Sequence, residues 1–357
     1  MEIARYGILL GLWAGLVPVC HAENLNWGTL FKKGAAVSPQ TEKYLAGVLS
    51  EARAKSDQCF PAVATIIGQG HLNTDPGWNT SYLAKKNIPM FLKLAVCARN
   101  EKDPVQRESC LQTAKFGLMT WAEVYKPNGD PINEAIFIPW AQALDVLNPL
   151  LEPNEKAQLE KFARAIIAAG DKYYGGMSSR DGKYYNNWGT YRLCERAFLA
   201  AAIGDKDMLK ATGKMLDAHL QENLLDNGQS IDFRDRDAFH YHVYDLYPLI
   251  EVAAQMPKGF LSGASMARIQ KSLDFMRPYF MGEKENIEFK DTKVAFDIKR
   301  KKAGYEKYQN QPWDPTEARE LLRLGRVPFP GIRNWTGSTV DAKYSNMFKL
   351  MVSVLEN

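Results

Sequence analysis

Two segments of the chain concentrate polar and aromatic side chains that could move protons on a bound molecule. One is KYYNNWGTY at residues 183–191, and the other is DFRDRDAFHYHVYDLYPL at residues 232–249. Histidine and tyrosine side chains can give or take protons, while asparagine amides and arginine guanidinium groups can bind a carboxylate. These residue types indicate acid–base chemistry on a bound anion.

The same set satisfies the needs of β-elimination on a uronic acid. The reaction needs a group that neutralises the carboxylate and so acidifies the neighbouring C5 proton, a base that removes this proton, and an acid for the leaving oxygen. A tyrosine close to cations can have a lowered pKa and serve as base, acid or both. Hydrolysis would instead use two carboxyl groups on opposite sides of the bond.

The asparagine pair Asn186-Asn187 and the string YHVYDLYPL at residues 241–249 resemble the alginate lyase domain of bacterial periplasmic mannuronate lyases. The resemblance is concentrated at residues 183–253. It implies an incomplete α/α toroid, an anionic polysaccharide substrate and no cofactor. It also implies that Asn187 binds the uronate carboxylate and that Tyr244 is the catalytic acid and often the base.

The chain departs from this family pattern in two ways. The family's carboxylate-binding arginine precedes the tyrosine string, and because this stretch is shortened here, Arg236 is the first choice and Arg234 the second. Trp188 stands where the family usually has a histidine. Either His242 or His240 could replace that imidazole from the neighbouring helix and tune the catalytic tyrosine, or Trp188 could stack on a sugar ring of a different substrate.

Further candidates for substrate contact are Asn186, Tyr241 and His71. His71 lies in GQGHLNTDPG, residues 68–77, a polar stretch between helices. In related lyases a loop in this region closes over the polymer, so His71 could touch substrate as part of a lid. Each candidate also has a structural explanation, because asparagine can cap the following helix, tyrosine can be a core aromatic and a loop histidine can face solvent.

Two other functions stay open. A glycoside hydrolase on a similar helical toroid would use carboxylates such as Asp232, Asp235, Asp237 or Glu134. A non-catalytic glycan-binding protein would retain the groove and bind polymer without shortening it. Reducing ends released without an unsaturated product would identify the hydrolase.

Hydrophobic spacing predicts helices along most of the chain. The apolar side chains between Leu159 and Ile167 fall at i, i+3, i+4, i+7 and i+8, which places them on one helix face. Polar turns separate similar stretches at about 40–56, 79–98, 106–124, 134–148, 188–203, 206–223, 241–256, 263–281 and 344–352. Because no strand segments alternate with them, we predict an all-α fold, an incomplete (α/α) toroid of antiparallel helices.

Residues 283–340 differ from the rest of the chain because they are rich in lysine and proline. We predict a long loop here, with a short helix at residues 315–324. The KRKK run at residues 299–302 is typical of a solvated surface, or of a surface that attracts an anionic polymer.

Residues 1–22 have the features of a signal peptide, with an apolar run at residues 8–19 and small residues ending at Ala22. The run is too short to span a bilayer comfortably. We therefore expect cleavage, export to the periplasm or the medium, no membrane attachment afterwards, and a single domain at residues 23–357. The formal net charge is only +4, and the sequence contains no long Lys/Arg run. We therefore expect no nucleic acid partner. A monomer is the plain expectation.

Four cysteines remain after residue 22, and export would allow them to form disulfides. They permit three pairings. A bridge between Cys97 and Cys110 is geometrically easy because the two flank a polar break between helices. A metal site is not expected, because no CxxC pair exists and the histidines lie far from the cysteines in sequence.

Overall fold

The structure is a computed structural model that describes residue 25 and residues 37–68, 70–178, 181–335 and 344–356. The predicted signal peptide at residues 1–22 lies outside these ranges. Within them the chain forms helices and no β-strand, with only two isolated bridges, Leu224–Ser230 and Ile287–Pro312. No helix among the described residues is long and apolar enough to cross a membrane. The prediction of an all-α fold is confirmed.

The predicted helices are present, with ends that differ by a few residues. They are α2 (Pro39–Arg53), α3 (Trp78–Asn100), α4 (Pro104–Val124), α6 (Phe137–Leu147), α7 (Pro153–Gly175), α8 (Asn187–Ala202), α9 (Lys206–Asn223), α11 (Phe239–Gln255), α12 (Gly263–Phe280) and α15 (Asn346–Leu355). The predicted helix at 315–324 is a 3-10 turn, η3 (Pro315–Ala318), followed by α14 (Arg319–Gly325). Three short helices were not predicted, α5 (Pro131–Glu134), α10 (Ile231–Arg236) and α13 (Ala295–Lys302). The remaining 3-10 turns are η1 (Asn148–Leu150), η2 (Glu306–Tyr308) and η4 (Pro330–Trp335).

Short polar side chains begin many of these helices. Ser38, Asp103 and Ser262 each accept a hydrogen bond from a backbone N–H in the first turn of the helix that follows. Such caps satisfy N–H groups that have no partner inside the helix. Asn186 caps α8 in the same way, accepting from the backbone N–H of Trp188 at 3.0 Å.

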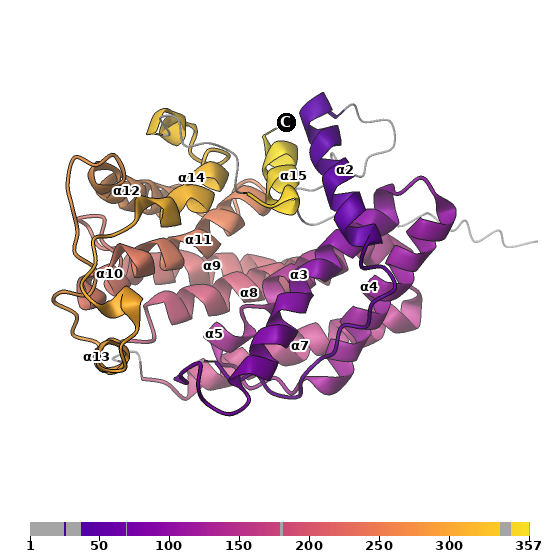
Figure 1. Cartoon of the computed structure of the whole chain (residues 1–357), viewed down its shortest axis with the longest axis horizontal. Coiled ribbons are helices and arrows are strands. Elements are labelled where there is room, and N and C mark those ends of the chain that lie inside the picture. The colour runs from indigo at the N-terminus through magenta and orange to yellow at the C-terminus, as the bar shows by residue number, and fades with distance from the viewer. Residues whose placement is uncertain (1–24, 26–36, 69, 179–180, 336–343, 357) are drawn as a thin grey trace, which may run out of the picture.

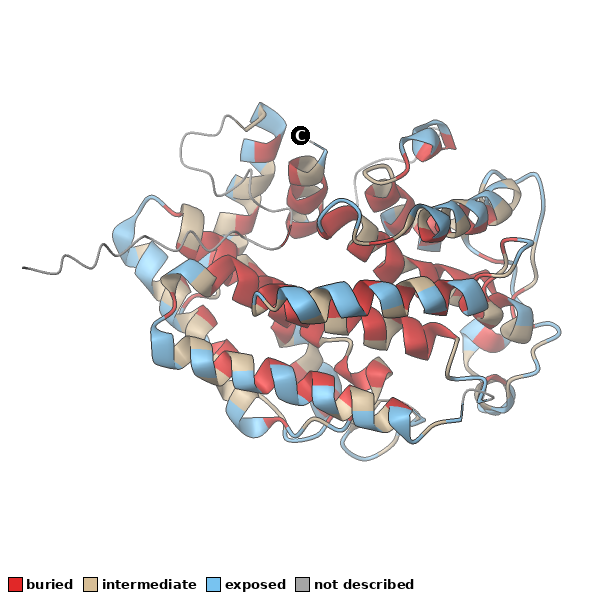
Figure 2. Ribbon diagram, turned by 180° about the vertical axis from the view of Figure 1, so that it is seen from behind, coloured by how far each residue is buried: buried red, intermediate tan, exposed pale blue. Residues whose placement is uncertain are grey.

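The helices form an inner and an outer group. Nearly all side chains of α6 and α8 are buried, and α11 is buried over most of its surface. In α7 and α9, by contrast, the buried residues follow one stripe, such as Leu216 and Leu220 in α9. Figure 2 shows this contrast as red central helices flanked by helices with a pale blue outer face. The inner helices are therefore the rigid scaffold on which a site can be built.

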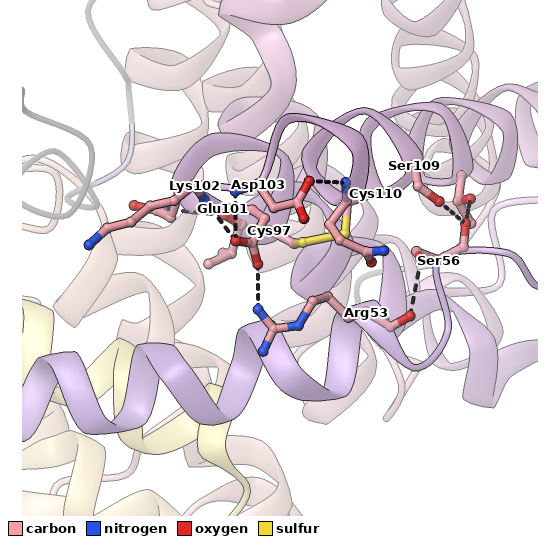
Figure 3. Close-up of a disulfide and its surroundings, with 12 residues drawn as sticks. Arg53, Ser56, Cys97, Glu101, Lys102, Asp103, Ser109 and Cys110 are labelled. Atoms are coloured by element: carbon pink, nitrogen blue, oxygen red, sulfur yellow. Dashed lines mark hydrogen bonds and ion pairs between the residues drawn. A yellow bond between two sulfur atoms is a disulfide. The ribbon is translucent and has the colours of Figure 1, made fainter.

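A disulfide joins Cys97 at the end of α3 to Cys110 in α4, which is the geometrically easy bridge among the three possible pairings, with the two Cα atoms 6.0 Å apart. The helices are connected only by residues 101–103 and pack side by side, so they run antiparallel. Beside the bridge, Arg53 of α2 donates a hydrogen bond of 2.6 Å to buried Glu101 (Figure 3). This corner thus ties three consecutive helices together.

The two ends of the described chain meet. Helix α2 packs against α15, where the hydroxyls of Thr41 and Ser353 lie 2.6 Å apart and Asn346 donates to Glu51 at 2.8 Å (Figure 1). The C-terminal part between α12 and α14 returns across α11, because η3 and α14 both contact that helix. This return brings the KRKK run of α13 toward the inner helices.

Candidate active site

A cavity of about 210 Å³ lies where α8, α10, α11 and α13 meet. We call it the arginine cavity. It collects side chains that are far apart in the sequence: Ile132, Asn187, Trp188, Arg236, His240, Tyr241, Tyr244, Phe296, Arg300 and Tyr308. Six of the predicted site residues are therefore brought together, namely Asn187, Trp188, Arg236, His240, Tyr241 and Tyr244.

Asn187 is held rigidly at the start of α8. Its backbone N–H donates to Oδ2 of Asp232 at 2.6 Å, and its side-chain Nδ2 donates to Oδ1 of Asp232 at 2.7 Å. Asp232 is 1% exposed. The buried carboxylate thus fixes the orientation of the amide, and Asn187 retains a second amide N–H for a ligand.

Arg236 is held by two buried carboxylates. Its Nε donates to Asp232 at 3.1 Å, and its Nη1 lies 2.7 Å from both carboxylate oxygens of Asp297. The guanidinium carbon Cζ lies 3.8 Å from the ring centre of Tyr241. Burial would lower the pKa of Arg236, but Tyr241, Asp232 and Asp297 together raise it, so the group stays charged.

Tyr244 lies on α11 against Tyr191 of α8, with ring centres 4.6 Å apart. Burial raises the pKa of Tyr244 above its ordinary value, while a hydrogen bond from the Tyr191 hydroxyl lowers it. The rise prevails, so the phenol keeps its proton at neutral pH. Tyr244 is thus in the form that can protonate a leaving group.

His240 pairs with a carboxylate from the C-terminal segment. Its Nδ1 lies 3.1 Å from Oε2 of Glu317, and Oε1 of the same carboxylate accepts from Lys307 at 2.7 Å. Burial lowers the pKa of His240, against the raising effect of Glu317, so the imidazole is neutral at pH 7. Burial acts to raise the pKa of Glu317, but hydrogen bonds from His240 and Lys307 bring it down to about 2. A neutral imidazole beside a carboxylate can act as a base.

A second cavity, of about 360 Å³, adjoins the first and shares His240 and Tyr244 with it. We call it the glutamate cavity, after Glu317 and Glu320 in its wall. Its other lining residues are Tyr191, Val243 and Tyr247. Burial raises the pKa of Glu320 above its ordinary value. One cavity therefore carries arginines and the other glutamates, with the imidazole and phenol between them.

His242 faces away from both cavities, which contradicts the prediction that this imidazole tunes Tyr244. The side chain is fully buried. Its Nδ1 accepts from the backbone N–H of Ser230 at 3.3 Å, and its Nε2 donates to the carbonyl of Ser272 at 3.1 Å. Burial lowers the pKa of His242 to about 4. Both ring nitrogens serve the scaffold, and of the two predicted histidines only His240 lies at the site.

Arg234 and His71 also lie away from the arginine cavity. Arg234 is exposed and pairs with its neighbour Asp235 at 2.8 Å, so the second choice for the carboxylate-binding arginine does not line the site. His71 is half exposed, with Nδ1 3.1 Å from Asp75. Its loop nevertheless reaches the C-terminal segment, because two hydrogen bonds, of 3.1 and 2.8 Å, join Asn73 to the hydroxyl of Tyr305.

The carboxylates considered for a hydrolase have other roles. Asp232 holds Asn187 and Arg236, and Glu134 is buried and accepts from the hydroxyl of Tyr125 at 3.0 Å. Neither they nor Asp235 and Asp237 line the two cavities. In the part of the chain that the structure describes, no cluster of three or more His, Cys, Asp or Glu side chains could hold a metal ion.

Several lining residues from the C-terminal segment were not predicted from the sequence. They are Phe296, Arg300 and Tyr308 in the arginine cavity, and Glu317 and Glu320 in the glutamate cavity. One signal was present: Phe296 and Arg300 are four residues apart, which places them on one face of a helix. This spacing was overlooked because Arg300 stands among lysines, and a basic run is typical of a solvated surface.

Comparisons with known proteins found one matching family model and several structures with a similar fold. The alginate lyase family model matches residues 112–286. The fold is similar to that of alginate lyase A1-III from Sphingomonas species A1, with 13% identity and a TM-score of 0.53 over 88% of this chain and 89% of that chain. For a variant of alginate lyase A1-III complexed with tetrasaccharide, the identity is 15% and the TM-score 0.52 over 86% and 93% of the two chains. No curated protein has a significant sequence match to this chain.

At these identities the structural likeness shows the fold alone, and it confirms the predicted incomplete (α/α) toroid. The family match is the independent finding, and it spans the segments that hold Asn187, Arg236 and Tyr244. Residues 112–286 of this chain therefore belong to the alginate lyase family of polysaccharide lyases, as the asparagine pair and the tyrosine string predict.

Proposed function

We propose that this protein is a polysaccharide lyase that cleaves an alginate-like, uronate-containing polysaccharide by β-elimination. The observation that carries the proposal is the convergence of Asn187, Arg236, His240 and Tyr244 on the arginine cavity. These four side chains offer an amide for the carboxylate, a buried positive charge, a neutral imidazole and a protonated phenol. Alginate lyase A1-III has been solved with a tetrasaccharide, which supports an oligosaccharide as ligand of this fold.

Binding of the uronate carboxylate comes first. The free amide N–H of Asn187 and a guanidinium in the wall neutralise the carboxylate and stabilise the negative charge that develops on it when the C5 proton leaves. Because Asp232 fixes the amide before substrate arrives, little reorganisation is needed during the reaction.

We assign the base to His240. With Nδ1 hydrogen-bonded to Glu317, the proton of the neutral ring sits on Nδ1 and the acceptor is Nε2. Nε2 takes the C5 proton, and Glu317 stabilises the imidazolium that forms. This arrangement supplies an imidazole where Trp188 has replaced the family histidine.

Tyr244 completes the reaction as the acid. The C4–O bond breaks, the electron pair left at C5 forms the C4–C5 double bond, and the phenol proton passes to the leaving oxygen. The hydroxyl of Tyr191 donates a hydrogen bond to the resulting phenolate. The products are a new reducing end and a 4,5-unsaturated uronate end, and the two protons balance when His240 later returns its proton through solvent to Tyr244.

The test is a polymer panel with the purified protein: polymannuronate, polyguluronate, glucuronan, acetylated alginate and neutral glycans. Absorbance of the unsaturated uronate and reducing ends are followed in parallel. A joint rise on an acidic polymer is expected and names the substrate. Reducing ends without absorbance would identify a glycoside hydrolase, and binding without shortening would identify a glycan-binding protein.

Export, domain organisation and oligomeric state belong to the same proposal. Residues 1–22 act as a signal peptide, residues 23–357 form one domain, and the protein works as a monomer in the periplasm or outside the cell. The Cys97–Cys110 disulfide supports an oxidising compartment. N-terminal sequencing of the exported protein should begin at Glu23, and light scattering should give the monomer mass.

A further inference from the structure

The two arginines of the arginine cavity are bonded differently. In Arg236, Nε donates to Asp232 and Nη1 to Asp297. In Arg300, only Nη1 is engaged, donating to the hydroxyls of Tyr241 at 2.8 Å and Tyr308 at 2.7 Å. Among the described residues, Nε and Nη2 of Arg300 have no hydrogen-bond partner.

This difference determines which arginine can bind a carboxylate through two parallel hydrogen bonds. Such a fork needs N–H groups from two neighbouring nitrogens. Arg300 keeps its whole Nε/Nη2 edge free. In Arg236, Nε and Nη1 are both occupied, so Nη2 is left alone and neither edge is complete.

The charges around the two arginines are also unequal. Asp297 lies 2.7 Å from Nη1 of Arg236 but 3.7 Å from Nη1 of Arg300. The two direct acceptors of Arg300 are tyrosine hydroxyls and not carboxylates, and its guanidinium lies 4.2 Å from the ring centre of Phe296. The Arg300 side chain is 20% exposed and that of Asp297 is 0% exposed. The arginine thus forms the wall of the cavity, and the carboxylate lies behind it.

We propose that Arg300 is the residue that binds a substrate carboxylate through a bidentate fork, and that Arg236 is a positioning residue. Arg236 holds Asp232, which in turn orients Asn187, and its ring contact holds Tyr241, which helps to fix Arg300. The inference rests on the proposed function, and it names the group that recognises the anionic part of the substrate.

Helix α13 offers a matched control for a test of this role. Lys302 lies two residues from Arg300 on the same helix and is exposed. Arg300→Gln and Lys302→Gln therefore remove the same charge from the same helix, but only the first removes it from the cavity wall. Arg300→Lys keeps the charge and removes the fork.

The experiment measures Kd for a mannuronate tetrasaccharide and for its carboxyl-reduced, uncharged form, together with KM on polymannuronate. Hydrogen bonds to charged groups predict that Arg300→Gln weakens acidic tetrasaccharide binding about tenfold or more, with a similar rise in KM. Arg300→Lys should lose most of the same affinity, while Lys302→Gln should stay within about twofold of wild type. Binding of the uncharged tetrasaccharide should be equal in all four proteins.

The inference is overturned if Arg300→Gln and Lys302→Gln bind the acidic ligand alike, if Arg300→Lys binds like wild type, or if Arg300→Gln weakens the uncharged ligand equally. Thermal unfolding of each variant separates loss of binding from loss of fold. The lyase proposal fails separately, through absence of the unsaturated product from wild-type protein, and the binding comparison does not depend on turnover.

Discussion

The arginine cavity and the glutamate cavity share one wall but have opposite charge. Helix α11 supplies His240 and Tyr244 to both. The charge comes from elsewhere: α13 adds Arg300 to one cavity, while η3 and α14 add Glu317 and Glu320 to the other. The buried inner helices thus position the reacting groups, and the short C-terminal helices supply the charged side chains of each cavity.

This division suggests unequal tasks on the two sides of Tyr244. A carboxylate is attracted by free guanidinium N–H groups and repelled by glutamates in a partly buried site. The arginine cavity is therefore suited to the uronate that loses its proton. The glutamate cavity orients the imidazole through Glu317 and leaves Glu320 as an uncompensated acid.

The largest effect should come from Tyr244, which lines both cavities. Tyr244→Phe removes the proton donor while keeping the ring against Tyr191, and we expect kcat to fall about 10³-fold or more with little change in KM. The measurement is initial rate of unsaturated product on the preferred polymer. Tyr44→Phe on the distant helix α2 is the control and should retain wild-type activity. Activity in Tyr244→Phe would remove the phenol from the mechanism.

The next largest effect should come from His242, on the opposite face of α11, and it concerns the free energy of unfolding. The His242 pKa is about 4 when folded against 6.5 when free. Between these values the unfolded chain binds a proton that the folded chain does not, so stability falls as pH drops from 6.5 to 4, by about 3 kcal/mol. Urea unfolding at both pH values should show this loss in wild type and a smaller one in His242→Gln. Equal losses would assign the acid sensitivity to other groups.

The imidazole on the cavity face should instead affect catalysis. His240→Gln is expected to lower kcat about 10²-fold, because the base is lost. In wild type, activity should fall on acidification only below the ordinary histidine pKa, since burial lowers the pKa of His240. Glu317→Gln removes the group that orients the ring and should cost less than His240→Gln. An unchanged acid limb of the pH–rate profile in His240→Gln would place the base elsewhere.

The smallest effect should come from the glutamate cavity itself. Glu320→Gln removes a repulsive charge and should raise kcat/KM on a polyuronate about two- to fivefold at low salt, with the gain shrinking as salt rises. Because burial raises the pKa of Glu320, the gain should also increase with pH as the wild-type carboxyl ionises. Glu108→Gln on α4 is the remote control. A loss of activity in Glu320→Gln would mean that this carboxyl contacts substrate favourably.

Much of the fold was predictable because the relevant signals are local. Apolar spacing along α7 specifies a buried face, and the short break between α3 and α4 brings Cys97 and Cys110 within bonding distance. The asparagine pair and the tyrosine string were equally readable, because each is a compact motif on one element.

Only the tertiary structure decided which of the neighbouring candidate residues line the cavities. His240 and His242 are two residues apart, and on a helix this rotates their side chains by about 200°, so one reaches the cavities and the other the core. Which of them faces inward depends on how α11 packs, and the motif does not carry that information. Arg300 lies 56 residues beyond Tyr244, in a basic run that looks like ordinary surface. Only the return of the chain across α11 brings its guanidinium to the site, because that placement depends on long-range contacts rather than on local sequence.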